Sequence, residues 1–484
     1  MISSKVSNLS KQTITSTIGF CACGFLLALA CGNILAQSVP SLATPPPSGP
    51  NAQSFQGSVP KGDVSAQPID LSLDDAIQRG LQTNLGILLS STQITGARGE
   101  KLEQLQSLLP SIDFSAKETA SQVDLPAEGL RIKGFPTIIG PFGYTDVRAS
   151  MNWSLVNVQS LRNYLAARHN FAAAQLSAQD ARDMVILTVG NAYLLVIADE
   201  TQVDSVQAQV NTSKVSLDQA VDNHEAGTAP LLDELRARVD YQSLQQQLIA
   251  AQNSLEKDKL ALARVIGLPL AQSFNLTDKA PYTPFDQLDA STLIEQAKRN
   301  RKDLAASVEQ AAAASDQRKA ATAARLPTLS TSADYGDIGT TLAHSHGTVD
   351  GSGTLSVPVF DEFALRGHAQ QAQAQLDSAQ EQLNDRQAQV EADVRDALLD
   401  IASAQKQVEV SRSSVDLSNE ALKEAQERYA NGVSDNLAVS QAQQSVAQAE
   451  DQYVASLYRH NVAKLSLARA LGDGQEYKKY LGGK

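Results

Sequence analysis

The sequence predicts a mainly α-helical protein that also contributes strands to a membrane β-barrel. Three observations indicate this class: long stretches rich in Ala, Gln, Leu and Ser, two pairs of segments with alternating apolar and polar residues, and the occurrence of the whole pattern twice. Aromatic residues make up only 5% of the 484 residues, which favours long helices or coiled coils over ordinary globular cores. We therefore expect four β-strands and long antiparallel coiled-coil helices in each chain.

The charge balance and the motifs exclude several classes of function. The chain carries 40 basic and 53 acidic residues, so it offers no basic patch for nucleic acid. It has neither a nucleophile elbow nor a Gly-rich phosphate loop, so we expect no enzyme activity and no cofactor. His344 and His346 lie on a predicted loop, and two imidazoles alone are a weak ligand set, so no metal site is predicted.

Residues 1–36 are predicted to be a secretory signal peptide. Lys5 and Lys11 precede an apolar run at 18–31. That run of about 14 residues is shorter than the roughly 20 that a membrane-spanning helix needs. We place the cleavage site after Ala36.

The cysteines leave one alternative open, namely that Cys31 is lipidated. The preceding Ala28-Leu29-Ala30 has the wrong order for a lipidation signal. With cleavage after Ala36 the mature chain has no thiol, which excludes disulfides and a thiol enzyme. The three cysteines are Cys21, Cys23 and Cys31.

Residues 37–70 are rich in Pro, Ser, Gly and Gln and are predicted to form a flexible periplasmic tether.

The mature chain is predicted to contain two structural repeats. Pro327 follows Pro110 by 217 residues, and Gly432 follows Gly227 by 205 in similar surroundings. A fall in the offset from 217 to 205 indicates a shorter loop in the second copy. The predicted boundaries are 71–267 for the first repeat, 268–289 for the linker, 290–472 for the second repeat and 473–484 for a C-terminal tail.

Each repeat is predicted to begin with a helix that ends before a proline. These helices occupy 71–108 and 290–325, and Pro110 and Pro327 follow them. Proline lacks a backbone donor and disfavours helix at the residue before it. The two prolines therefore mark the predicted helix-to-barrel junctions.

Two strand pairs follow these prolines, at 111–124 with 144–156 and at 328–336 with 347–359. Their apolar residues alternate with Ser, Asn, Asp and Arg, as in outer-membrane barrel strands of about 10 residues. A soluble sandwich is the alternative, but no other segment could cover the apolar face. Four strands cannot close a barrel alone, so we expect a trimer with about 12 strands.

Two exceptionally long helices are predicted at 158–225 and 363–430. At about 1.5 Å per residue each is roughly 100 Å long, too long for a compact domain. Gly227 and Gly432 then turn the chain into a shorter returning helix. In a trimer, such helices would extend the barrel wall as a periplasmic tunnel.

The duplicated order of elements resembles the TolC-like outer-membrane efflux protein family, the outer-membrane factors. The resemblance covers roughly 70–472 and rests on LPSIDFSA with LPTLSTSA, AYLLVIADE, AGTAPLLDEL, RYANG, and LARVIGL with LARALGD. It implies a homotrimeric channel-tunnel embedded in outer-membrane lipid, with a long periplasmic extension. It also implies a periplasmic adaptor (membrane fusion) protein and an inner-membrane RND or ABC transporter as partners. Small-molecule export is expected, and the exit duct of a type I protein secretion system is the alternative.

The same resemblance implies a gate and an adaptor contact at the periplasmic tip. Family members close this tip with polar links near the two glycine turns. The matching positions here are Asp233, beside Gly227, and Tyr429, beside Gly432. A tyrosine hydroxyl that donates to a carboxylate would hold two coils together.

The chain departs from the family at three further tip positions. Ser434 stands where some relatives have arginine, and Ala438 and Gln441 stand where some carry an inward pair of aspartates. A strongly acidic gate that binds cations is therefore not expected at the tip.

Overall fold

The computed structural model describes residues 52–481 apart from 279–281, 286–288, 432 and 435. These residues belong to one compact unit, Thr44–Lys484. The predicted signal peptide with its three cysteines, and Gly432, lie outside the described residues.

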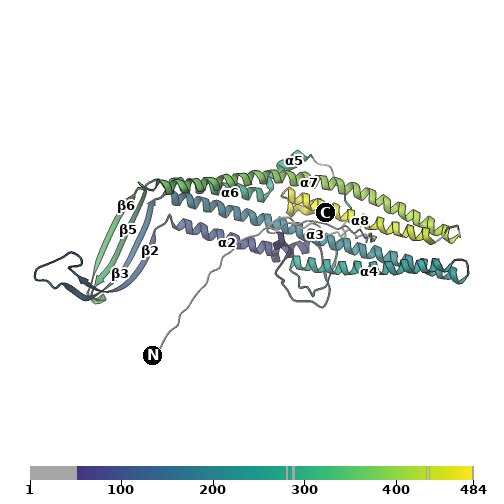
Figure 1. The fold of residues 1–484 in the computed structure, drawn as a ribbon, viewed down its shortest axis with the longest axis horizontal. Helices are drawn as coiled ribbons and strands as arrows, with labels where there is room; N and C mark the ends of the chain where they lie inside the picture. Colours follow the sequence, from purple (N-terminus) through teal and green to yellow (C-terminus); the bar gives the residue numbers. More distant parts are fainter. Residues whose placement is uncertain (1–51, 279–281, 286–288, 432, 435, 482–484) are drawn as a thin grey trace, which may run out of the picture. The chain divides into compact units, whose positions relative to one another are not determined.

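One order of elements occurs twice along the chain (Figure 1). Two consecutive helices lead into a pair of strands, and a very long helix and a shorter returning helix follow. The first set comprises α1 (Leu73–Thr83), α2 (Leu85–Gln106), β2 (Ser111–Asp124), β3 (Ile138–Val156), α3 (Val158–Glu225) and α4 (Leu231–Ile266). The second set comprises α5 (Ala290–Asn300), α6 (Lys302–Ala323), β5 (Thr328–Gly339), β6 (Ser345–Ser356), α7 (Glu362–Ala430) and α8 (Asn436–Ala470).

Each predicted entry helix is two helices, so the expectation of one continuous helix over 71–108 and over 290–325 is wrong. Asn84 and Arg301 have extended backbone angles between the two parts. The Asn84 side chain accepts a hydrogen bond from the Gly86 amide at 2.9 Å, which starts α2 as a new helix. The Arg301 guanidinium is buried and bonds to Asp303 at 2.7 Å. Asn84 Nδ2 also donates to the Phe55 carbonyl at 2.7 Å, and Arg301 Nη1 donates to Asp393 on α7 at 2.5 Å. These long-range contacts interrupt a helical pattern that is continuous in the sequence.

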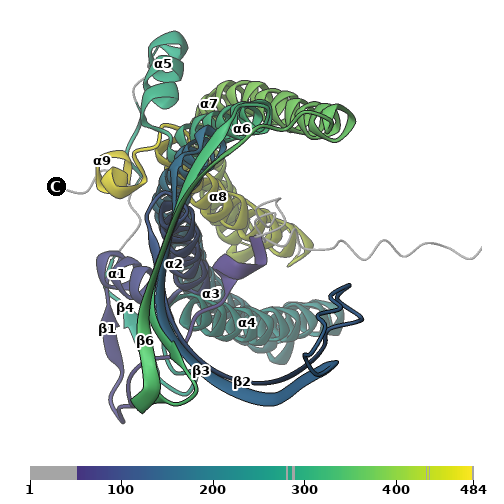
Figure 2. The same cartoon turned by 90° about the vertical axis from the view of Figure 1, so that its left-hand side faces the viewer.

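The four long strands form one antiparallel sheet in the order β2-β3-β5-β6. Figure 1 shows the four strands side by side, and Figure 2 shows the curvature of the sheet. β3 begins at Ile138 rather than 144, because its first residues pair with the end of β2. β5 extends to Gly339, past the predicted 336. β6 runs over Ser345–Ser356 instead of 347–359, and it ends before Pro358, which has no amide to donate to a ladder.

The helices pack as long antiparallel layers. α3, with 68 residues, contacts α2, α4, α6 and α8, and α7, with 69 residues, contacts α6 and α8. Each is about 100 Å long at 1.5 Å per residue. Among the described helices only α3 contains a stretch that is long and apolar enough to cross a membrane, and more than half of that stretch is buried within the chain. Helix packing accounts for this apolar character.

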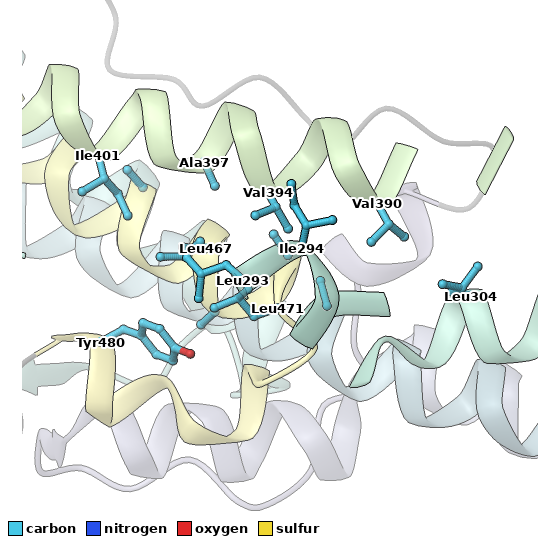
Figure 3. Close-up of a cluster of buried hydrophobic side chains, with 14 residues drawn as sticks. Leu293, Ile294, Leu304, Val390, Val394, Ala397, Ile401, Leu467, Leu471 and Tyr480 are labelled. Atoms are coloured by element: carbon cyan, nitrogen blue, oxygen red, sulfur yellow. The ribbon is translucent and has the colours of Figure 1, made fainter. Parts of the chain in front are cut away.

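Small residues allow the helices to approach closely. A Cβ atom on Gly80 would lie 2.7 Å from Cγ2 of Val189, and one on Gly190 would lie 2.7 Å from Cδ1 of Leu465. α1 and α8 therefore both pack tightly on α3. A separate apolar cluster joins α5, α7 and α8 (Figure 3), and it includes Leu293, Val394 and Leu467.

The described end of the predicted tether, residues 52–70, packs on the helices rather than extending freely. A 3-10 helix (Ala52–Gln56) is followed by backbone hydrogen bonds from Val59 to Thr83 and from Lys61 to Gly267, each 3.0 Å. The short strand β1 (Ile69–Leu71) then pairs with β4 (Phe274–Leu276). The last described elements are the 3-10 turn Gly474–Glu476 and the short helix α9 (Tyr477–Leu481).

Candidate functional site

The predicted junction prolines lie between helix and sheet. Pro110 separates α2 from β2, and Pro327 directly precedes β5. The indole Nε1 of Trp153 on β3 donates to the Leu108 carbonyl at 3.1 Å, so a side chain of the sheet holds the end of α2. This bond ties the first strand pair to the end of α2.

The sheet has one apolar face that the chain itself does not cover. By the strand register, Ile112 and Phe114 share this face with Tyr335 and Val349. Their exposed fractions are 74%, 74%, 64% and 79%. Large apolar side chains at this exposure need lipid or protein as a cover. The face therefore suits the hydrocarbon region of a bilayer.

The opposite face of the sheet is polar and crosslinked by charge. The Arg148 guanidinium bonds to Asp334 on the neighbouring strand, with Nη1 to Oδ1 at 2.7 Å. Its Nε also lies 2.9 Å from Oδ1 of Asp146. The Ser332 and Ser352 hydroxyls bond to each other at 2.8 Å. Such a face belongs in water, so it is suited to line a lumen.

A cavity of about 540 Å³ lies where α2 meets the polar face. Hydroxyl and amide side chains of β2, β3, β5 and β6 form much of its lining, and Glu103 contributes a carboxylate from α2. The cavity continues the polar surface of the sheet toward the helices. A solute that moves between the two regions would meet hydrogen-bonding groups there.

The turn between α3 and α4 forms the first tip. Gly227 has a φ of +73°, a left-handed conformation that residues with a Cβ rarely adopt. The Thr228 amide bonds to the Asn223 carbonyl at 2.9 Å and closes the turn. Asp233 follows in the first turn of α4 and is only 7% exposed.

A hydrogen bond joins the second tip, between α7 and α8, to the first. Nδ2 of Asn436 donates to the Asp233 carbonyl at 3.2 Å. The Asp233 carboxylate itself lies 3.9 Å from Nη1 of Arg236. Within the described part of the chain the Tyr429 hydroxyl is buried and has no hydrogen-bond partner. One chain therefore does not form the expected link between Tyr429 and Asp233.

Sequence reasoning missed two residues that connect the tips. Asn436 starts α8 and is 3% exposed, and the Ser440 hydroxyl donates to Oδ2 of Asp240 on α4 at 2.6 Å. The signal was available, because polar side chains near a helix start often cap or bond locally. Their partners on another hairpin become visible only once the two hairpins lie side by side.

A buried cation holds the linker between the repeats against α8. Lys464 is 1% exposed, and its Nζ donates to the Thr283 carbonyl. A ring nitrogen of buried His460 contacts the same carbonyl at 3.1 Å. Burial lowers the pKa of the Lys464 ammonium to about 8 and also lowers the pKa of His460.

A pair of carboxyl groups lies between α3 and α4. Asp199 is 8% exposed, and its Oδ2 has no hydrogen-bond donor among the described residues. Burial, together with the hydrogen bond to Asp258 and the charge of Asp258, raises the pKa of the Asp199 carboxyl well above its ordinary value. Lys259 and Glu200 form an ion pair beside them at 3.1 Å.

The sequence matches a protein-family model and is similar to known outer-membrane proteins. The family model described as outer membrane efflux protein matches residues 81–268 and 293–473. The pyoverdine export outer membrane protein OpmQ of Pseudomonas putida is 24% identical over 311 residues, which cover 64% of this chain and 66% of OpmQ. The outer membrane protein OprJ of Pseudomonas aeruginosa is 26% identical over 455 residues, which cover 88% of this chain and 89% of OprJ.

A solved structure has the same fold. The CmeC outer membrane channel of Campylobacter jejuni superposes with a TM-score of 0.75 at 18% identity. The superposition covers 88% of this chain and 95% of CmeC. The helical layers and the strand pairs of this chain therefore have the same fold as CmeC.

Proposed function

Because the chain belongs to the outer membrane efflux protein family, whose members are outer-membrane proteins with a periplasmic extension, we propose that it forms a homotrimeric exit duct for small molecules. The duct would work with a periplasmic adaptor protein and an inner-membrane pump of the RND or ABC class. The pyoverdine exporter named above, itself a relative, supports small-molecule cargo.

The open sheet is the observation that carries this proposal. β2 and β6 each have one strand edge without a partner in the order β2-β3-β5-β6. Lipid cannot satisfy the backbone groups of such an edge, so a barrel has to close. Copies of this chain supply matching edges, and three copies give about 12 strands, which is within the range of outer-membrane barrels.

The surface of α7 supports the same assembly. Leu399, Val410 and Leu417 are 68%, 68% and 64% exposed. Their spacings of 11 and 7 residues correspond to about three and two helical turns, so the three side chains lie on one helix face. An exposed apolar stripe at heptad-like spacing suits contact with a helix of a neighbouring copy.

The tips offer a surface for the adaptor. Leu231, Leu232 and Leu235 begin α4 and are 51%, 53% and 46% exposed, and Val433 beside the second turn is 69% exposed. Exposed leucines around two polar turns suit a helical hairpin of a partner protein. In this proposal Gly227, Asp233, Tyr429 and Gly432 mark the tip gate and the adaptor contact, and Pro110 and Pro327 mark the barrel entrance.

An accumulation assay tests the function. We expect cells that lack this protein to accumulate an efflux dye, and re-expression of the wild type to restore export. A variant with Val410→Glu should fail to restore it, because a charge would be buried in the helix contact between copies. The control Glu409→Gln changes the adjacent residue without adding a charge. Unchanged dye export, together with loss of a secreted protein from the medium, would favour the type I secretion alternative.

A further inference from the structure

The strand register places three carboxylates in one row on the polar face of the sheet. Asp113 on β2 is opposite Ser150 on β3, which is opposite Asp334 on β5, which is opposite Asp350 on β6. Residues that are directly opposite on neighbouring strands point to the same face. We call Asp113, Asp334 and Asp350 the acidic row.

This row faces the lumen if the sheet closes as proposed above. The positions next to it along the strands, such as Ile112 and Phe114 on β2 and Val349 on β6, carry the apolar face. Side chains alternate between faces along a strand, so the acidic row lies opposite the lipid. A row of carboxylates in hydrocarbon would be unfavourable, which also argues against the reverse orientation.

The rows nearer the helices carry no charge. Ser111, Asn152, Ser332 and Ser352 form the row directly below the acidic row, and Ser154, Ser330 and Thr354 follow toward the helices. A solute that leaves the helical region would first pass hydroxyl and amide groups. The acidic row is then the first charged layer that it meets in the sheet.

Only part of the acidic row is neutralised within the chain. Arg148, one row further out, pairs with Asp334 at 2.7 Å. It can lie across β5 because Gly336, directly opposite, has no side chain, and a Cβ there would be 2.4 Å from Cβ of Arg148. No ion pair within the described part of the chain reaches Asp113 or Asp350. These two carboxylates therefore keep their negative charge exposed.

We infer that the acidic row makes the barrel the charge-selective segment of the duct, favouring cationic over anionic solutes. The inference rests on the proposed trimeric duct, in which three carboxylates per chain would place nine in the wall. Rings of carboxylates are a common source of cation preference in channels. At the tip, Ala438 and Gln441 stand where some relatives carry aspartates. These two side chains are uncharged and cannot supply this cation preference.

Reversal potentials of the purified protein in a planar bilayer under a KCl gradient test the inference. The double substitution Asp113→Asn with Asp350→Asn should lower the K⁺ to Cl⁻ permeability ratio roughly threefold, because it removes two of the three carboxylate charges that each chain contributes to the row. Arg148→Gln should raise the ratio, since it frees the charge of Asp334. A general distortion of the sheet would not lower the permeability ratio in the double variant and raise it in Arg148→Gln.

Asp337→Asn is the matched control. Asp337 lies on β5 like Asp334, but its register partner Val147 places it on the apolar face. We expect this variant to keep the wild-type ratio. A conducting trimer whose ratio is the same in the wild type and in the double variant would overturn the inference while leaving the proposed function intact. Absence of any conductance in the wild type would instead contradict the duct itself.

Discussion

Asn436 on α8 donates a hydrogen bond to the backbone carbonyl of Asp233 on α4, at 3.2 Å and across 203 residues of sequence. Both residues are more than nine-tenths buried. The bond joins the hairpin that ends at Gly227 to the hairpin formed by α7 and α8. Together with the bond from Ser440 to Asp240, it joins the two tips within one chain.

Asn436→Ala should loosen the tip. The substitution removes one of the two donors to the buried Asp233 carbonyl, which still accepts a backbone amide within α4, so we expect a cost of about 0.5–1.5 kcal/mol per chain. We expect a lower melting temperature of the detergent-solubilised protein and a larger conductance in a planar bilayer. Asn431→Ala is the control, because the Asn431 side chain bonds locally, to the Glu427 carbonyl at the end of α7. Equal conductance of both variants would show that the bond does not hold the tip.

Tyr429→Phe tests the gate at the same end. The hydroxyl is buried and has no partner among the described residues, so the substitution should leave the folding of one chain intact. In the proposed gate the tip repacks in the trimer so that this hydroxyl pairs with Asp233, and its removal should raise the conductance at unchanged trimer yield. Wild-type conductance in both Tyr429→Phe and Asp233→Ala trimers would mean that other residues close the tip.

The buried Lys464 ammonium should make the free energy of unfolding depend on pH in the alkaline range. Its pKa is about 8 in the folded chain and about 10.4 when unfolded, so between these values the unfolded chain binds more protons. The free energy of unfolding should therefore rise with pH in this window, by up to about 3 kcal/mol per chain. Lys464→Met keeps the apolar stem and should flatten that rise, measured as the melting temperature between about pH 7 and 10.

The control for this effect is Lys257→Met, which removes an exposed lysine on α4. It should keep the wild-type pH dependence. If Lys464→Met and Lys257→Met shift the melting temperature alike at every pH, the buried ammonium does not carry the effect.

Asp199 should have the opposite effect, so that its contribution to the free energy of unfolding falls as pH rises. Its pKa is raised in the folded chain, so its contribution to stability is present below the ordinary value near 4 and is lost as pH rises through the raised value. Asp199→Asn removes the buried charge and should raise the melting temperature above neutral pH, with little change near pH 4. Asp204→Asn, at an exposed position on α3, should have no such effect. A uniform shift at all pH values would contradict proton sharing with Asp258.

The main architecture could be predicted because it depends on local pattern. Alternation with period 2 identified the strands, and the helical stretches before Pro110 and Pro327 identified the junctions. The long helices followed from uninterrupted small and straight-chain residues, which favour helix throughout. These features belong to short segments and need no knowledge of distant contacts.

Features that depend on distant contacts were not predictable. The breaks at Asn84 and Arg301 arise from a backbone carbonyl at Phe55 and from a carboxylate at Asp393 on α7. The acidic row requires the register of four strands, which no single strand specifies. The bond from Asn436 to Asp233 likewise requires two hairpins, each of which reads as an ordinary helical turn by itself.

The molar mass of the detergent-solubilised protein tests the central claim most directly, because four strands with two open edges cannot close a barrel in one chain. Light scattering corrected for bound detergent should give three times the mass of one mature chain, and chemical cross-linking should stop at three chains. A monodisperse monomer that remains soluble in water without detergent would contradict the account.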